Sequence, residues 1–395
     1  MPVTRPRPAL ILFLALFTSQ AGFLVLTPIL SDLANDLHVS TATAGGLRIA
    51  SGLTGGAVAL AVSVVGRRLG LRDLIAAGLM LVILGSAISA LAPGFAVLAA
   101  GQLVFGAGQA TIVSGAVAAA ARWSTPDTRA SVLGSALLGQ PASWIAGTPL
   151  IGLLSGISWR LAFCVPLGAG AIALAALLTR AADAPSGERA GIRTLLTRDR
   201  LIAGWAAGEL LAYGAWGGTL TFAGALLIES YGASPGLVGV LLAAAGAAYF
   251  PGNLLARRRL TESPRRLLAR HGAALAIAVA VFGTVRPGLW FSVSLFALTV
   301  LLVAGRTLAG SAAGLDAAPR DAVVVMSIRA AATQLGIVAG GAVGGIALAA
   351  GGYGLLGVML SVLFAAGVLP HLSAMRARPG RDSFEVAPAT GGAAR

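Results

Sequence analysis

The sequence lacks lysine and is poor in acidic residues, histidine and cysteine. All 28 basic residues are arginine, beside 14 acidic residues, three histidines and one cysteine. A single cysteine excludes a disulfide framework, and we expect Cys164, inside an apolar run, to be a small buried residue. The histidines form no metal-spaced pair, and no H-E-x-x-H, G-x-S-x-G or G-x-x-x-x-G-K-[ST] motif is present. We therefore expect a protein that is not an enzyme and binds no cofactor or metal.

Charged side chains are scarce, at 11% of the chain, whereas hydrophobic residues make up 57% and the mean hydropathy is +0.88. A soluble domain carries about 25% charged residues, so this composition is typical of a membrane protein. The net charge of +14 would suit a nucleic-acid partner if the basic residues gathered on one polar face. They lie instead in short segments between apolar runs, so we expect the lipid bilayer, and not nucleic acid, as the partner.

Long apolar runs fill most of the sequence. A membrane-spanning helix needs about 20 mostly apolar residues, and helices satisfy their backbone groups internally where strands of this length do not. We expect twelve transmembrane helices, over residues 9–36, 42–65, 73–92, 96–121, 130–155, 160–180, 200–229, 235–256, 266–285, 288–310, 321–350 and 353–374.

Arginine is concentrated in every second gap between these runs. The remaining gaps hold only Arg160 and Arg286. Cytoplasmic loops of membrane proteins retain arginine, so the alternation predicts an even number of spans with both termini in the cytoplasm. The lysine-free usage, rich in alanine, glycine and arginine, suggests a GC-rich bacterial genome and hence a bacterial plasma membrane.

The longest internal polar segment divides the chain almost in half. We expect a six-helix bundle, a cytoplasmic linker, a second six-helix bundle and a disordered tail, over residues 1–182, 183–199, 200–375 and 376–395. Weak similarity at an offset of 197 supports a duplicated unit, since Leu138, Gly139 and Gly147 match Leu335, Gly336 and Gly344. The predicted fold is an all-α membrane protein with twelve helices in two pseudo-symmetric bundles.

Three segments carry recognisable motifs. The end of run one reads LTPILSDLANDLHVS from Leu26, run five reads GQPASWIAGTPLIG from Gly139, and the turn after it contains Trp159 and Arg160. Together they resemble the twelve-helix drug/proton antiporter branch of the major facilitator superfamily. The resemblance implies proton-coupled export of a small amphipathic compound by a monomer, with helices one, four, seven and ten around a central cavity.

Two positions depart from that family's pattern. In the loop after run two, Arg68, Gly70 and Arg72 match the family motif, but Arg67 stands where the family has aspartate. In run four, Gln102 stands where proton antiporters carry a buried arginine. An uncoupled facilitator or an importer of a small solute therefore stays open, as does a non-transporting membrane sensor or membrane-embedded enzyme.

Glu209 is the leading candidate for binding substrate or protons. It lies about 12 Å into run seven, where an ionisable group is costly and is a functional hypothesis by default. Trp205, Tyr213 and Trp216 share its helix face and would stack an aromatic or cationic substrate beside the acid. In the alternative, Glu209 is salt-bridged within the bundle and Trp205 belongs to the interfacial aromatic belt.

Arg48 and Asp32 are candidates for a gate. Each lies about two turns from the short connection between runs one and two, so we expect them to pair at one depth of a helical hairpin. Pairing would offset the cost of burying Arg48. The pair is either a static structural contact or an outer gate that opens during transport.

Buried amides and the glycines and prolines of run five complete the candidates. Gln20, Gln102 and Gln109 either face the cavity or join helices by hydrogen bonds, and Arg329 either does the same or extends to the cytoplasmic surface. Small residues and prolines allow close, kinked packing, which is either ordinary packing or a pliable seam between the halves. The gating candidates in run five are Gly139, Pro141, Gly147 and Pro149.

Overall fold

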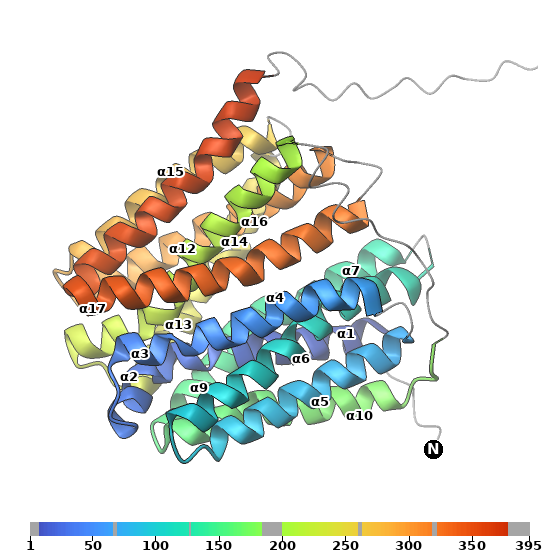
Figure 1. Ribbon diagram of the computed structural model, residues 1–395, viewed down its shortest axis with the longest axis horizontal. Helices are drawn as coiled ribbons and strands as arrows, with labels where there is room; N and C mark the ends of the chain where they lie inside the picture. The colour runs from blue at the N-terminus through green and yellow to red at the C-terminus, as the bar shows by residue number, and fades with distance from the viewer. Residues whose placement is uncertain are drawn as a thin grey trace, which may run out of the picture.

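The computed structural model describes residues 8–65, 69–125, 128–183, 200–259, 263–317 and 322–377. Every regular element in this part of the chain is a helix. The helices form twelve rods in two groups of six, and Figure 1 shows the N-terminal group below the C-terminal group. This agrees with the all-α, two-bundle fold predicted from the sequence.

The N-terminal bundle contains four rods built from more than one element and two single helices. Its first two rods are α1 (Pro8–Leu24) with α2 (Leu26–Asp36), and α3 (Thr41–Gly45) with α4 (Leu47–Val65). The next two are α5 (Leu71–Ala90) and α6 (Phe95–Arg122). The fifth is α7 (Arg129–Leu137), α8 (Gly139–Ala142), η2 (Ser143–Gly147) and α9 (Thr148–Ser155), and the sixth is η3 (Trp159–Phe163) with α10 (Cys164–Leu178).

The C-terminal bundle has longer elements. It begins with α12 (Arg200–Tyr231), followed by α13 (Pro235–Gly246) with α14 (Tyr249–Arg259), α15 (Pro264–Thr284), α16 (Leu289–Ala317) and α17 (Ala322–Ala377). The last element holds two rods, since its backbone leaves the helical conformation at Gly351 and Gly352. Gly352 has φ 62°, a left-handed conformation that favours glycine at this sharp turn.

Within the described residues, nine segments are long and apolar enough to cross a membrane. One of them, Ile328–Leu372, contains both rods of α17, and the interrupted second and fifth rods are not among the nine. Some helix boundaries also differ from the prediction. For example, α16 continues to Ala317 instead of ending at residue 310. Cys164 is exposed, contrary to the expectation that it is buried, because it lies on the outer face of α10.

The predicted repeat is visible in the packing of two glycines. A Cβ atom on Gly139 would collide with the carbonyl oxygen of Phe13 and lie 2.9 Å from the amide nitrogen of Phe17. A Cβ atom on Gly336, 197 residues later, would collide with the carbonyl oxygen of Leu210 and lie 2.9 Å from the amide nitrogen of Gly214. The fifth rod therefore packs on the first as the eleventh packs on the seventh.

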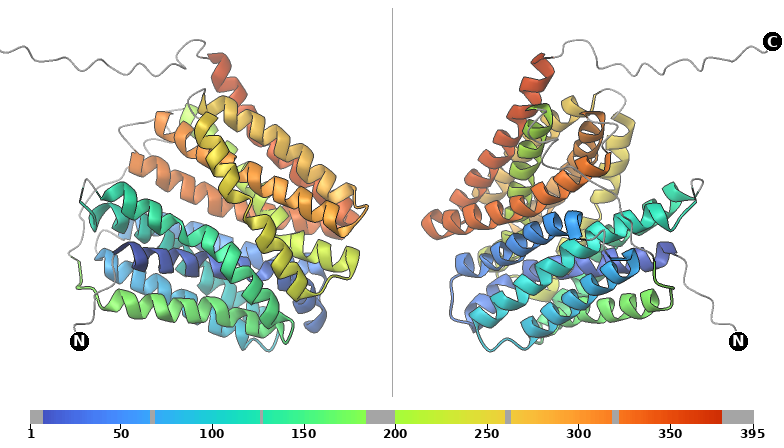
Figure 2. Two further views of the ribbon diagram at one scale, coloured as in Figure 1. Left: turned by 180° about the vertical axis from the view of Figure 1, so that it is seen from behind. Right: turned by 45° about the vertical axis from the view of Figure 1, so that its right-hand side comes forward.

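The two bundles meet along a glycine-rich seam. The first rod of α17 runs beside α4, as Figures 1 and 2 show, and Gly52 would place a Cβ atom 2.7 Å from Val338. On the other side, α9 approaches α13, where Gly152 and Gly239 would each place a Cβ atom 2.8 Å from the other's Cα. Small residues such as these glycines allow the backbones of the two bundles to approach closely.

The molecule has two different ends. We call the end with the turns after α2, α5, α9, α12 and α15 the short-turn end, and the opposite end the long-connection end. Three hydrogen bonds join the bundles within the described residues, and all three lie toward the short-turn end. Their donors and acceptors come from α2, α3, α4 and α12.

Candidate functional site

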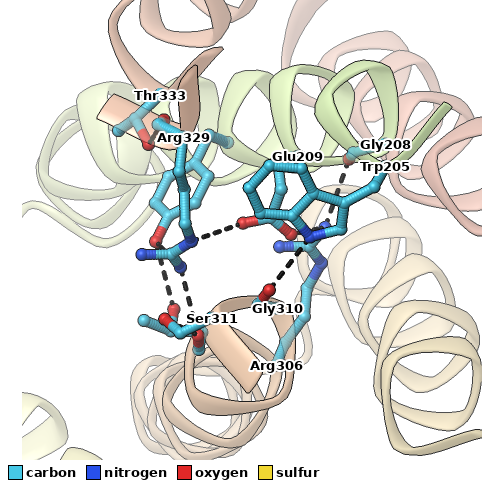
Figure 3. A network of polar contacts seen from close by, with 10 residues as sticks. Trp205, Gly208, Glu209, Arg306, Gly310, Ser311, Arg329 and Thr333 are labelled. Atoms are coloured by element: carbon cyan, nitrogen blue, oxygen red, sulfur yellow. Dashed lines mark hydrogen bonds and ion pairs between the residues drawn. The ribbon is translucent and has the colours of Figure 1, made fainter. Parts of the chain in front are cut away.

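A charged cluster lies inside the C-terminal bundle. Glu209 of α12 is fully buried, and its carboxylate contacts Arg306 of α16 and Arg329 of α17 (Figure 3). Arg306 Nη2 lies 2.9 Å from Oε1, and Arg329 Nε donates to Oε2 at 2.9 Å. One carboxylate thus sits between two guanidinium groups, which leaves a formal excess of one positive charge.

Backbone and hydroxyl groups hold both arginines in place. Arg306 Nη2 donates a hydrogen bond to the carbonyl oxygen of Gly208 at 3.2 Å. Its contact with Glu209 Oε1 is an ion pair without hydrogen-bond geometry. Arg329 Nη2 donates to the hydroxyl oxygen of Tyr213 at 2.8 Å and to the carbonyl oxygen of Thr307 at 3.1 Å. Charge-assisted bonds of this kind fix the orientation of a guanidinium group.

Close helix packing brings the cluster together. A Cβ atom on Gly310 would lie 2.6 Å from Glu209 Oε1, so a side chain at this point of α16 would displace the carboxylate. Trp205 donates its indole N–H to the carbonyl oxygen of Gly310 at 2.9 Å, and its ring occupies the space beside Gly314. Two glycines of α16 thus make room for the acid and for the indole ring.

The predicted face of α12 points at α16. Besides Trp205 and Glu209, Tyr213 lies 3.4 Å from the hydroxyl of Thr307, and Trp216 stacks on Phe296 at 6.1 Å. Trp216 also stacks on Trp144 of η2 at 6.2 Å, so its ring spans the two bundles. The shared face follows from the spacing along α12, whereas its partners come from elements that the sequence could not place beside it.

These contacts bear on the structural alternatives for Glu209, Trp205 and Arg329. Glu209 is ion-paired within the bundle, as the alternative interpretation expected. The placement of Trp205 in an interfacial aromatic belt is wrong, because its side chain is buried and hydrogen-bonded inside the bundle. The placement of Arg329 at the cytoplasmic surface is also wrong, because pairing with Glu209 draws the guanidinium into the interior.

Arg48 is fully buried but does not pair with Asp32. It donates to the hydroxyl oxygens of Thr221 at 3.2 Å and Thr27 at 3.4 Å, and its guanidinium lies 4.0 Å from the centre of the Phe23 ring. The expected pair does not form, because the distance of each residue from the turn gives its depth in the bundle but not the direction of its side chain. The helix breaks after Leu24 and Gly45 also change which face of each rod a residue lies on. Arg48 instead bridges the bundles through Thr221.

The predicted amides are placed as follows. Gln102 is buried and donates to the hydroxyl oxygen of Ser89 at 3.1 Å, so it joins α6 to α5. Gln109 is buried on the same element, and Gln20 of α1 is partly buried. At the repeat offset of 197, Gln109 corresponds to Arg306, so the N-terminal bundle has an amide where the C-terminal bundle has a charge.

The loop candidates for gating lie within the N-terminal bundle. Arg72 donates its backbone N–H to Asp183 Oδ2 at 3.1 Å and its side chain to Asp73 at 3.1 Å. A Cβ atom on Gly70 would collide with the carbonyl oxygen of Asp183. Arg68 lies outside the described residues.

Run five divides its small residues between two neighbours. Gly139 and Gly147 face α1, which belongs to the same bundle, whereas Gly152 faces α13 across the seam. Pro141 in α8 and Pro149 near the start of α9 flank the five-residue π-helical turn η2. The α-helix is therefore interrupted by a π turn at this point, and π turns are frequent at functional sites.

Glu229 is a contact that sequence reasoning missed. Its Oε1 accepts hydrogen bonds from Ser31 at 2.6 Å and Thr41 at 2.7 Å in the N-terminal bundle. Its Oε2 accepts one from Tyr353 at 2.9 Å in its own bundle. An acid at the last position of an apolar run was the only signal in the sequence. We call Glu229, Ser31, Thr41 and Tyr353 the latch.

The described residues contain no group of three or more histidine, cysteine, aspartate or glutamate side chains placed to hold a metal ion.

Among curated protein sequences, none matches the chain. A family model described as Major Facilitator Superfamily matches residues 12–208. The chain belongs to the major facilitator superfamily.

Solved structures of transporters share the fold over nearly the whole chain. The D-xylose-proton symporter has a TM-score of 0.73 at 14% identity, with 92% of this chain and 96% of that chain covered. A single-residue mutant of the nucleoside transporter NupG has 0.76 at 12%, with 94% and 99% covered. A bacterial homologue of the human lysosomal transporter Spinster, inward-facing and occupied, has 0.75 at 16%, with 96% and 98% covered. This member of the superfamily is therefore a multi-pass membrane transporter and not an enzyme.

Proposed function

We propose that this chain is a secondary active transporter that exports a small amphipathic compound, such as a drug, a metabolite or a sugar-like molecule, in exchange for protons. It acts as a monomer in the bacterial plasma membrane, with both termini in the cytoplasm. The resemblance of runs one, five and six to the drug/proton antiporters supports export. The arginine-rich connections support placing the long-connection end in the cytoplasm.

One observation carries the transport mechanism: the hydrogen bonds that join the bundles lie toward one end of the molecule. Thr221 accepts from Arg48, and Glu229 accepts from Ser31 and Thr41, all toward the short-turn end. Contacts of this kind are made in one state of an alternating-access cycle and broken in the other. The outer end is then closed here, and rocking of the bundles would open it.

Glu209 is the proposed proton-binding residue. It is the only fully buried acid among the described residues, and α12, α16 and α17 all meet at its carboxylate. A proton on this carboxylate would release Arg306 and Arg329 from their ion pairs and loosen three elements at once. Proton binding and bundle movement would be linked in this way.

A second candidate is an importer or an uncoupled facilitator. Two observations favour it over export. Gln102, bonded to Ser89, stands where proton antiporters carry an arginine, and Glu209 is already neutralised by two arginines. The direction of transport relative to protons separates the two candidates.

Flux through membrane vesicles tests both candidates. We would use everted vesicles with and without the protein, and three amphipathic probes of different charge: ethidium, chloramphenicol and fluorescein. Export by antiport predicts that an inside-acidic gradient drives at least one probe into the vesicles and that an uncoupler abolishes this uptake. Flux down the probe's own gradient that ignores the uncoupler would support the facilitator, and the absence of protein-dependent flux for all three probes would contradict transport.

A further inference from the structure

The buried interior of the described chain holds more positive than negative charge. Arg48, Arg306 and Arg329 lie in the interior, whereas Glu209 is the only fully buried acid of the described residues. Buried charges are expected to be paired, because an isolated ion in a low-dielectric region is very costly. The excess around Glu209 therefore calls for a compensating negative group.

Arg329 has a donor available for such a group. Its Nε binds Glu209 and its Nη2 binds Tyr213 and Thr307, whereas Nη1 has no partner within the described chain and points away from Glu209 (Figure 3). The side chain is 15% exposed, compared with 5% for Arg306 and 0% for Glu209. The open part of the cluster is thus its positive edge, and the acid lies behind it.

The surroundings of Arg329 suit an anion with an apolar body. The hydroxyl of Tyr213 and the hydroxyl of Thr307, both partly buried, lie beside the guanidinium. The Tyr213 ring lies 5.3 Å from the Arg329 guanidinium carbon, which places an aromatic surface next to the charge. A guanidinium group presents paired donors that match the oxygens of a carboxylate or a phosphate.

We propose that Arg329, supported by Arg306 and Glu209, binds an anionic group, a carboxylate or a phosphate, on the transported compound. The proposal rests on the transport function proposed above and names the class of its cargo. A cationic cargo would add its charge to the existing excess, whereas one anionic group cancels it. Arg48 is not part of this site, because it is fully buried at the seam and bonded to Thr221 and Thr27.

Equilibrium dialysis of the purified full chain tests the proposal without any transport step. The probes are labelled benzoate and labelled inorganic phosphate, with benzamide and benzylammonium as neutral and cationic competitors of the same shape as benzoate. We expect saturable binding of at least one anion and no competition by benzylammonium. Binding of neither anion, or stronger competition by benzylammonium than by unlabelled benzoate, would overturn the proposal.

Two variants separate charge from geometry. Arg329→Gln leaves Arg306 paired with Glu209 at zero net charge, and we expect the affinity to fall about tenfold or more. Glu209→Gln combined with Arg306→Gln keeps the excess charge and Arg329 but removes the carboxylate that orients the guanidinium, so we expect anion binding weaker than in the unaltered protein but stronger than in Arg329→Gln. Arg122→Gln, which removes an exposed arginine at the end of α6, is the matched control and should bind like the unaltered protein.

The outcomes distinguish this proposal from the transport function. If Arg329→Gln does not fold, Arg329→Lys keeps the charge without the planar fork, and a loss of affinity without a loss of stability would support the site. Equal affinities for Arg329→Gln and Arg122→Gln would overturn it. A protein that prefers benzylammonium but passes the vesicle assay would be a transporter with a different cargo, whereas failure of the vesicle assay alone contradicts transport.

Discussion

At the scale of single residues, charge is what distinguishes this transporter. Arg48 has no carboxylate partner and its Nη1 has no hydrogen-bond partner in the described chain, although its side chain is fully buried. The Glu209 carboxylate contacts both Arg306 and Arg329, but its Oε1 atom accepts no hydrogen bond in the described chain. Residues that cost stability in this way are expected at positions where function requires them.

Replacing Arg48 with methionine should stabilise the protein. Methionine keeps an apolar contact with Phe23 and removes a buried charge that has no counter-ion, and burying such a charge is costly. Thermal unfolding followed by tryptophan fluorescence checks this, and we expect a higher midpoint together with slower flux. A midpoint several degrees lower would mean that Arg48 is stabilised by contacts other than those with Thr27 and Thr221.

Replacing Glu209 with glutamine should destabilise the protein and abolish coupling. It leaves Arg306 and Arg329 side by side without a counter-charge, which costs about 3–5 kcal/mol. Adding Arg306→Gln should restore stability but not proton-dependent flux, because no titratable acid remains in the cluster. Unfolding midpoints and uncoupler-sensitive uptake are the measurements, and unchanged pH dependence in the double variant would rule out Glu209 as the proton site.

At the scale of helices, close packing and one latch determine how the bundles are held. Gly139 and Gly336 occupy equivalent positions in the two repeats, and each places its helix against a backbone carbonyl. The latch joins the bundles through a single carboxylate, Glu229. The first type of contact holds each bundle together, whereas the latch and the bond from Arg48 to Thr221 join the bundles to each other.

The equivalence of the two glycines predicts equal effects of substitution. Gly139→Ala and Gly336→Ala should each lower the free energy of unfolding by about 1–3 kcal/mol, because an added methyl group overlaps the facing backbone. Gly134→Ala is the control, since a Cβ atom there meets nothing within 4 Å. Thermal unfolding of the three variants is the measurement. A loss of stability in only one of the two equivalent variants would argue against a shared packing role.

The latch predicts that Glu229→Gln opens the short-turn end. A neutral amide has one acceptor oxygen and cannot accept from Ser31, Thr41 and Tyr353 as the carboxylate does. A cysteine placed at buried Ala44, in a background without Cys164, should react faster with a membrane-impermeant maleimide in this variant.

A matched control for the latch variant is Asp36→Asn. Asp36 lies at the same end but binds Arg160 and Trp159 within the N-terminal bundle. We expect this variant to leave the labelling rate at residue 44 unchanged. Equal acceleration by both substitutions would show general loosening of this end and would contradict a specific latch.

At the scale of the whole molecule, the sequence predicts the number and order of the rods but not their lateral contacts. Arginine spacing and run length give twelve spans because both depend on position along the chain. The cluster of Glu209, Arg306 and Arg329 depends on three helices meeting, which spacing within any one of them cannot reveal. The break after Leu24 and the π turn η2 rotate faces that a continuous helix would have kept in register.

Pulsed electron spin resonance distances test the central claim, which is that the two bundles rock about the seam. One label pair joins Ile157 and Trp290, which are exposed near the short-turn end, and the other joins Arg122 and Arg259, which are exposed near the long-connection end. Compared with the labelled protein that retains Glu229, the Glu229→Gln variant should show a longer distance for the first pair and a shorter distance for the second. Lengthening of the first distance without shortening of the second, or no change in either, would contradict alternating access by these bundles.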